Sequence, residues 1–329
     1  MLSRVYCLAP DKPTDKIFNI FDVYKSHGVR ILFLAKPKSD HDSFKKLPIF
    51  YENFEYISLD DQKNIDFGLY TNIDEDDKFR LNLGMLYAYR QKAKTIFLID
   101  LDEETELNYL FEKVTIGNFL NSEHDIDLFV TEDAVLDPFQ ATTSTHMWHR
   151  GFPWEKLISR NSIVKNLNYR IKPFVQTSFI NGSTDVDNLG KIFFQPDAQI
   201  SISKPFTSNA LMPFNCLNTL IKREAVPYYF IFQNLGNISD IFGSYVFQLY
   251  FKNSVLYSWP TLTRFGEKQS NIDSLEQDIQ DQKLISAFFE NPSEYKQLLS
   301  KQNLLSLEIY RTNFPEINFE SGETSWVSG

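Results

Sequence analysis

The sequence predicts an α/β fold in which a mostly parallel central sheet is flanked by helices and followed by a C-terminal helical extension. Strand-like and helix-like segments alternate through about the first hundred residues, and short β-α-β units of this kind build parallel sheets. Beyond about residue 271 the chain carries segments of helical periodicity instead. We therefore expect a first domain over residues 1–270 and a helical extension with a tail over residues 271–329.

Hydrophobic patterning places the individual elements. Apolar runs bounded by turn residues predict strands, and apolar residues at helical spacing predict helices. In the first part, strands are expected at 4–8, 29–34, 54–58 and 95–101, and helices at 14–26 and 78–90. The segment from about 120 to 235 is irregular, with several Pro and Gly residues. Then come a helix over 239–252, a strand over 254–259 that Pro260 ends, and two helical segments separated by Asn291 and Pro292.

The most informative motif is the pair Asp100 and Asp102, at the end of the expected strand over 95–101. Residues two apart on a strand point to the same side. Two carboxylates ~6.5 Å apart repel by roughly 2.5 kcal/mol at an effective dielectric constant of ~20. A divalent cation that carries a diphosphate would offset this repulsion, and ligands of such sheets bind at the carboxyl ends of strands. The alternative is that the two acids merely begin a loop.

Composition excludes several other kinds of site. The net charge of −10 argues against nucleic acid as a partner, because phosphate binding needs a basic surface. Cys7 and Cys216 form no disulfide framework, which favours a reducing, cytoplasmic location. No apolar run approaches the ~18 residues of a membrane span. The chain has no glycine-rich phosphate loop, so a metal ion and positioned arginines remain the route to a phosphate.

Two arginines are candidates for phosphate contacts. Arg80 falls in the first turn of the expected helix over 78–90, where the backbone N–H groups and the helix dipole favour an anion. Its alternative role is an ion pair with the acidic segment 74–77. Arg150 follows Trp148 in a short loop rich in turn residues. Arg150 could bind a diphosphate through two hydrogen bonds, and Trp148 could offer a stacking surface to an acceptor.

Three further aspartates each have two possible roles, one structural and one functional. Asp240 begins the expected helix over 239–252, where it either complements the helix dipole or acts as the general base that deprotonates an acceptor hydroxyl. Asp185 and Asp187 lie on one side of the chain if that segment is extended. They either anchor the local structure or contact sugar hydroxyls. Spacing in the sequence does not choose between these readings.

Several segments, taken in order, resemble a known family. They are Phe54-Glu-Tyr-Ile-Ser-Leu-Asp-Asp-Gln62, Arg80-x-Asn82-x-Gly84-x-Leu86-Tyr-Ala88, the stretch 94–102, Trp148 to Pro153, Asn181-Gly-Ser-Thr-Asp-Val-Asp187, Phe214-Asn-Cys-Leu-Asn-Thr-Leu220 and Ser239-Asp-Ile-Phe-Gly-Ser-Tyr245. Over about residues 45–270 this order resembles the STELLO-type glycosyltransferases. More distantly it is similar to the reversibly glycosylated polypeptides, which act as UDP-arabinopyranose mutases.

The resemblance implies a type-A glycosyltransferase fold, which is Rossmann-like, and a nucleotide-sugar donor, with a UDP-sugar favoured. It implies Mn²⁺ or Mg²⁺ at Asp100 and Asp102. It places Arg80 and Asn82 beside the donor and Arg150 near its sugar-phosphate, and it puts Asp240 on the acceptor side. With Asp100 at the metal and Asp187 at the sugar hydroxyls, the predicted donor-binding residues are Arg80, Asn82, Asp100, Arg150 and Asp187. The chain departs from the family after Asp102, where Glu103 and Glu104 follow, and at Pro260, where the mutases carry a His. A third metal ligand is not identifiable from the motif, and Glu267 or a water is left to take that coordination position.

We therefore predict a metal-dependent glycosyltransferase that transfers a sugar from a nucleoside-diphosphate sugar to a hydroxyl acceptor in glycan or polysaccharide synthesis. One alternative is a nucleotide-sugar mutase that shares the donor site. Another is a non-catalytic scaffold that keeps the fold without the chemistry. Peripheral association with a membrane and homo-oligomerisation stay open.

Overall fold

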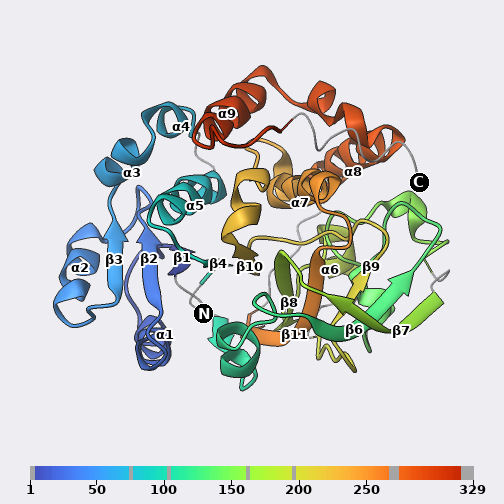
Figure 1. Cartoon of the computed structure of the whole chain (residues 1–329), viewed down its shortest axis with the longest axis horizontal. Helices are drawn as coiled ribbons and strands as arrows, with labels where there is room; N and C mark the ends of the chain where they lie inside the picture. Colours follow the sequence, from blue (N-terminus) through green and yellow to red (C-terminus); the bar gives the residue numbers. More distant parts are fainter. Residues whose placement is uncertain are drawn as a thin grey trace.

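A computed structural model describes residues 4–73, 77–101, 105–160, 164–194, 198–266 and 274–319. One mixed sheet runs through the molecule with helices on both of its faces (Figure 1). In that view α5 (Leu81–Arg90), α7 (Ser239–Tyr250) and α9 (Lys301–Thr312) lie along one side of the sheet, and α1 (Asp15–Ser26) lies on the other. This architecture is a large α/β sheet flanked by helices, and it is compatible with a glycosyltransferase fold.

The N-terminal part of the sheet is parallel, as predicted. It contains β1 (Arg4–Leu8), β2 (Arg30–Leu34), β3 (Phe54–Ile57) and β4 (Thr95–Ile99), in the order β3-β2-β1-β4. The pairs β1–β2, β1–β4 and β2–β3 are all parallel. Because the chain returns through helices between these strands, the carboxyl ends of all four meet at one edge of the sheet.

The rest of the sheet is mixed, so the predicted mostly parallel sheet describes only the first strands. β10 (Asn218–Lys222) is antiparallel to both β4 and β8 (Val175–Gly182), and β11 (Val255–Arg264) is parallel to β8. The sheet continues through β9 (Phe206–Ser208), β6 (His124–Val130) and β7 (Val164–Ile171), and β5 (Thr105–Leu107) pairs with β11. The carboxyl ends of β4, β8 and β11 therefore share an edge with the start of β10.

The strand predicted to end at Trp259 continues to Arg264 as β11. Its register against β8 shifts between Ser258 and Leu262. Pro260 lies inside this irregularity, where its missing N–H interrupts no regular ladder bond. Pro260 thus interrupts the regular pairing without ending the strand, and Arg264 reaches the carboxyl edge of the sheet.

The remaining helices are mostly short. Among the α-helices these are α2 (His41–Lys46), α3 (Leu59–Ile65), α4 (Phe67–Thr71), α6 (Asn188–Phe194) and the longer α8 (Ser274–Glu290). The short helical turns are η1 (Leu47–Ile49), η2 (Asp77–Arg80), η3 (Glu112–Ile116), η4 (Pro138–Ala141), η5 (Trp154–Lys156), η6 (Arg223–Tyr228), η7 (Gly236–Ile238) and η8 (Pro292–Leu298). The predicted helix over 78–90 is thus η2 followed directly by α5.

Close packing of α5 on the sheet depends on Gly84. A Cβ at this position would lie 2.6 Å from Cδ1 of Tyr6 and 2.8 Å from Cδ1 of Leu34. A Cβ this close would have to displace the Tyr6 ring and the end of Leu34, so Gly84 lets the helix lie directly on β1 and β2. The space at Gly84 therefore serves helix packing.

The C-terminal helices belong to the same hydrophobic core as the sheet. Ile285 and Phe288 of α8 and Tyr310 of α9 are buried in one cluster with strand residues such as Val5 and Phe97. Cys7 and Cys216 are buried and form no disulfide. No helix in the described part of the chain is long and apolar enough to cross a membrane.

Candidate active site

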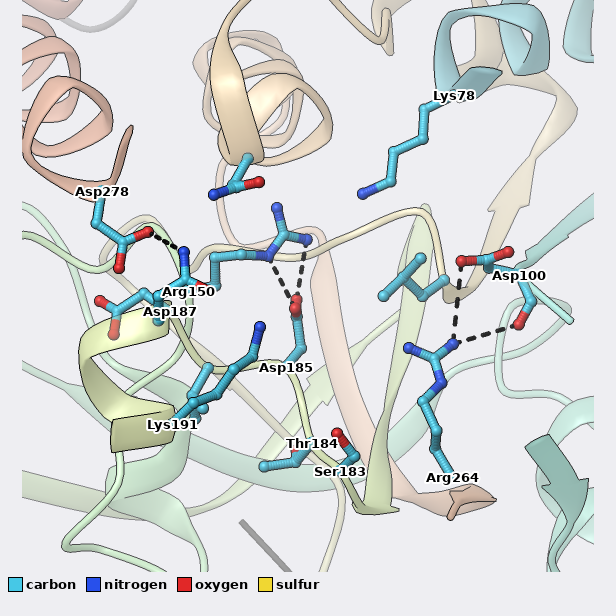
Figure 2. Close-up of a pocket in the computed structure, with 14 residues that line it drawn as sticks. Lys78, Asp100, Arg150, Ser183, Thr184, Asp185, Asp187, Lys191, Arg264 and Asp278 are labelled. Atoms are coloured by element: carbon cyan, nitrogen blue, oxygen red, sulfur yellow. Dashed lines mark hydrogen bonds and ion pairs between the residues drawn. The ribbon is translucent and has the colours of Figure 1, made fainter. Parts of the chain in front are cut away.

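A cavity of about 200 Å³ lies at the edge of the sheet where β4, β8 and β11 end (Figure 2). Ligands of open α/β sheets bind at this edge. The described residues that line the cavity include four cationic side chains, Lys78, Arg150, Lys191 and Arg264. They also include four carboxylates, Asp100, Asp185, Asp187 and Asp278. Such a lining suits a polar, charged ligand more than an apolar one.

Asp100 and Arg264 form one end of the cavity. Asp100 directly follows β4, and its side chain is 38% exposed. Nη2 of Arg264 donates to the backbone oxygen of Asp100 at 3.4 Å and lies 4.0 Å from Oδ2 of the same residue. Arg264 was not among the predicted site residues, because the strand was expected to end at Trp259. The available signal was a basic residue shortly after an apolar strand.

Arg150 is held between two carboxylates. Its Nε and Nη2 donate to Asp185 at 2.8 and 3.1 Å, and its Nη1 and Nη2 donate to Asp240 at 3.1 and 3.3 Å. Burial alone would lower the pKa of Arg150, but Asp185 and Asp240 outweigh it and hold that pKa well above its usual value. A guanidinium has five N–H donors, so these four bonds leave one. To bind a diphosphate through two hydrogen bonds, as predicted, Arg150 would have to break its bonds to one of these carboxylates.

Asp240 is fully buried in the first turn of α7 and does not line the cavity. Besides Arg150, its carboxylate accepts from the backbone N–H of Cys216 at 3.1 Å and lies 3.8 Å from Nζ of Lys78. Burial raises the pKa of Asp240, but Arg150 and Lys78 outweigh burial and lower it to about 2. A general base must reach its substrate and hold a pKa near the working pH. This geometry favours a role in holding Arg150 and Lys78.

Asp187 lines the cavity and joins two tryptophans. Its Oδ2 accepts from Nε1 of Trp148 at 2.8 Å and from Nε1 of Trp154 at 2.7 Å, and its Oδ1 accepts from the N–H of Gly190. Trp148 is only 7% exposed, with its ring edge-on to Phe194. Its ring therefore offers little surface to an acceptor. Trp154 is half-buried, and nothing in the sequence distinguished it from Trp148.

Arg80 and Asn82 are buried away from the cavity lining. Asn82 bridges the backbone of Ile231, donating to its carbonyl at 2.8 Å and accepting from its N–H at 3.0 Å. Nη1 of Arg80 donates to Oε1 of Gln62 at 3.1 Å. These bonds anchor η2 and the start of α5, and Lys78 on η2 is the side chain that reaches the cavity.

The predicted metal site is described only in part. Asp100 lines the cavity, but Asp102, like Glu103, Glu104 and Glu267, lies outside the described residues. Within the residues that are described, no three His, Cys, Asp or Glu side chains form a group that could hold a metal ion. The described residues therefore supply one carboxylate toward such a site, and a divalent cation stays a prediction.

Helix α8, which begins the predicted C-terminal helical extension, forms part of the cavity wall. Asp278 lines the cavity and accepts from Nδ2 of Asn188 at 2.9 Å and from the N–H of Leu189 at 3.1 Å. One turn further, Asp281 accepts from the N–H of Asn237, another lining residue, at 3.0 Å. Residues three apart share one helix face, so one face of α8 holds two segments that border the cavity.

Comparison with known proteins supplies one similarity. No protein-family model matches the chain. The chain is similar to the "Probable glycosyltransferase STELLO2" of Arabidopsis thaliana, with 26% identity over 196 residues, which is 52% of this chain and 24% of that protein. The match thus spans about a quarter of the relative's length. It supports the STELLO-type part of the resemblance, and the more distant similarity to the mutases stays a prediction.

Proposed function

We propose that this chain is a glycosyltransferase that binds a nucleoside-diphosphate sugar in the cavity at the ends of β4, β8 and β11. The observation that carries the proposal is the meeting of Lys78, Lys191 and Arg264 around this cavity. These three cations come from η2, α6 and β11, and in Figure 2 Lys78 and Lys191 approach from opposite sides. The similarity to a probable glycosyltransferase supports the same reading.

The lining suits a diphosphate chemically. Ammonium and guanidinium groups form charge-assisted hydrogen bonds to phosphate oxygens, and fixed cations stabilise the negative charge that develops on a leaving diphosphate. Lys78 is kept in its charged form: burial lowers its pKa, but Asp240, Cys216 and Asp100 together outweigh burial and raise the pKa of Lys78 overall. Asp187 and Asp185 also line the cavity, and we assign them to the hydroxyls of the donor sugar. From the resemblance, a UDP-sugar is the favoured donor, and glycan or polysaccharide synthesis is the setting.

A divalent cation belongs to the proposal through Asp100 and Asp102. Mn²⁺ or Mg²⁺ bound there would supply charge neutralisation between the two phosphates. Asp100 is an oxygen ligand that faces the cavity and fits such an ion. The rest of the fit depends on Asp102, so we derive no step from the metal.

In this proposal Asp240 acts through the cations that it holds. Its carboxylate orients Arg150 and keeps Lys78 charged, and we assign the removal of the acceptor proton to no described residue. Arg80 and Asn82 anchor η2 and the start of α5, and they thereby fix the backbone that carries Lys78. Arg150 is left with one N–H for the donor, and its main contribution is to fix Asp185 at the cavity wall.

Calorimetric titration with UDP, GDP and CDP, each with Mn²⁺ and with a chelator, tests the proposal. At least one nucleotide should bind, and Lys191→Met should weaken that binding ~10-fold or more, because a charge-assisted hydrogen bond is worth about 1.5–3 kcal/mol. Lys25→Met on α1 is the matched control and should leave affinity unchanged. Asp102→Asn should remove any dependence on Mn²⁺. No binding of any of the three nucleotides under either condition would refute the proposal and favour the scaffold.

A further inference from the structure

A second hollow, of about 410 Å³, lies between Trp154 and one face of α8. We call it the α8 groove and define it by Trp154 and Glu155 of η5 and by Ile279, Lys283, Ser286 and Glu290 of α8. Its volume falls within the range of small-molecule sites. The donor proposal makes no use of it.

Trp154 is fixed in place on the wall of this groove. Its Nε1 donates to Asp187 at 2.7 Å, and its backbone N–H donates to Oε1 of Gln282 at 2.9 Å. Nε2 of the same Gln282 donates to the carbonyl of Phe152 at 3.1 Å. Trp154 is therefore held by both its indole N–H and its backbone N–H, and it stays half-buried beside the open groove. A rigid aromatic ring loses little entropy when a ligand packs on it.

The other walls combine apolar and polar groups. Ile279 is 45% exposed beside the tryptophan. Ser286 donates to Glu155 at 2.9 Å, and Lys283 and Glu290 are exposed at the rim. Two carboxylates face one ammonium, which disfavours an anionic ligand such as a phosphate. An aromatic ring flanked by both donors and acceptors suits a neutral ligand with many hydroxyls, whose C–H groups pack on the ring while its hydroxyls form hydrogen bonds.

The groove and the cavity share a wall. Asp187 lines the cavity and accepts the N–H of Trp154, which lines the groove. Helix α8 borders both, with Asp278 in the cavity and Ile279 in the groove. A ligand in the groove would therefore lie next to the cavity in which the proposed donor binds.

We propose that the α8 groove binds the acceptor as a neutral oligosaccharide, with one sugar ring stacked on Trp154. This inference rests on the proposed function, since it assigns the second substrate of the same reaction. It gives the C-terminal helix a role in acceptor recognition.

Titration with cellohexaose, xylohexaose and mannohexaose, followed by tryptophan fluorescence and by NMR, tests the inference. At least one should bind at millimolar concentration. Ala287 also lines the groove, so Ala287→Arg, which fills the groove, should weaken that binding ~10-fold or more. Gln297→Arg adds the same side chain at an exposed position on η8 and should have no effect. Both variants should bind nucleotide as the parent chain does.

The possible results separate this inference from the donor proposal. Nucleotide binding without binding of any of the three oligosaccharides overturns the groove assignment and leaves the donor site standing. Oligosaccharide binding that Ala287→Arg does not weaken also overturns the assignment. Oligosaccharide binding that Ala287→Arg abolishes, in a chain that binds no nucleotide, supports the groove as a carbohydrate site and refutes the transferase.

Discussion

Arg150 and Asp185 are joined through both their side chains and their backbones. Nε and Nη2 of Arg150 donate to the two carboxylate oxygens of Asp185 at 2.8 and 3.1 Å, and the N–H of Arg150 donates to the carbonyl of Asp185 at 3.1 Å. The loop that contains Trp148 is thereby tied to the segment that follows β8. Because both segments border the cavity, this pair determines the shape of one of its walls.

Asp185→Asn should destabilise the fold by about 2–3 kcal/mol at neutral pH, since it weakens hydrogen bonds to a buried charge. Burial raises the pKa of Asp185, but Arg150 and the other charge and hydrogen-bond partners together outweigh burial and hold that pKa well below its usual range. A lowered pKa adds stability above the unfolded-state pKa of about 4, and that stability is lost as the pH falls. Urea unfolding of the variant and the parent should therefore differ most at neutral pH and converge in acid. Asp125→Asn, which breaks the exposed pair with Arg170, is the control and should change stability little.

Asp281 should give stability the opposite pH dependence. Burial raises its pKa to about 6, so the folded chain holds the proton at a pH where the unfolded chain has lost it. The contribution of Asp281 to stability is greatest below pH ~4 and falls as the pH rises through about 6. The free energy of unfolding of the parent minus that of Asp281→Asn should decrease over this interval. A difference that stays flat over this interval would overturn the raised pKa of Asp281.

Asn82→Ala should separate a structural role from a role in donor binding. The substitution leaves the buried N–H and carbonyl of Ile231 without their side-chain partners, which should cost about 2–4 kcal/mol of stability. The affinity for nucleotide, measured by calorimetry at a temperature where the variant is folded, should stay unchanged. Asn19→Ala on the exposed face of α1 should alter neither quantity. A loss of nucleotide affinity in a stably folded Asn82→Ala protein would instead show that Asn82 contributes to donor binding, as the resemblance implies.

Asp240→Asn should act on binding and stability rather than on the chemical step alone. Removing this buried carboxylate leaves Arg150 and Lys78 with a neutral partner, which should cost about 3 kcal/mol of stability and weaken nucleotide affinity. Steady-state kinetics with a transferable donor should then show a raised KM. If kcat falls by orders of magnitude while stability and affinity are both preserved, Asp240 is the general base after all.

The parallel half of the sheet follows from local sequence. The runs that form β1, β2 and β4 are apolar after their first residue, because strands covered by helices on both faces have no polar side. Asp100 is the first polar residue after such a run, so its place at the edge of the sheet is predictable. The end of β11 was not, because the effect of Pro260 depends on whether the neighbouring strand accommodates an irregularity.

Most of the site comes from contacts between distant segments. Arg150 and Asp240 lie 90 residues apart, and Asn188 and Asp278 also lie 90 residues apart. Spacing along the chain carries no information on such pairs. Asp240, for which the sequence allowed either a helix-dipole role or a role as general base, accepts hydrogen bonds from Arg150. Trp148 and Trp154 differ only in how far the surrounding fold covers them.

By itself the sequence determined the strands and the two longer helices of the first hundred residues, the parallel arrangement of the first four strands and the position of Asp100 at their carboxyl edge, whereas the strands between residues 120 and 235 were not predicted. Hydrophobic periodicity and strand order are local or nearly local properties, and they are written in neighbouring residues. Only the tertiary structure decided which cations meet Asp100, which carboxylates are occupied by Arg150, and that α8 borders the site. Those relations depend on long-range packing, in which a side chain's partner is set by the path of the whole chain.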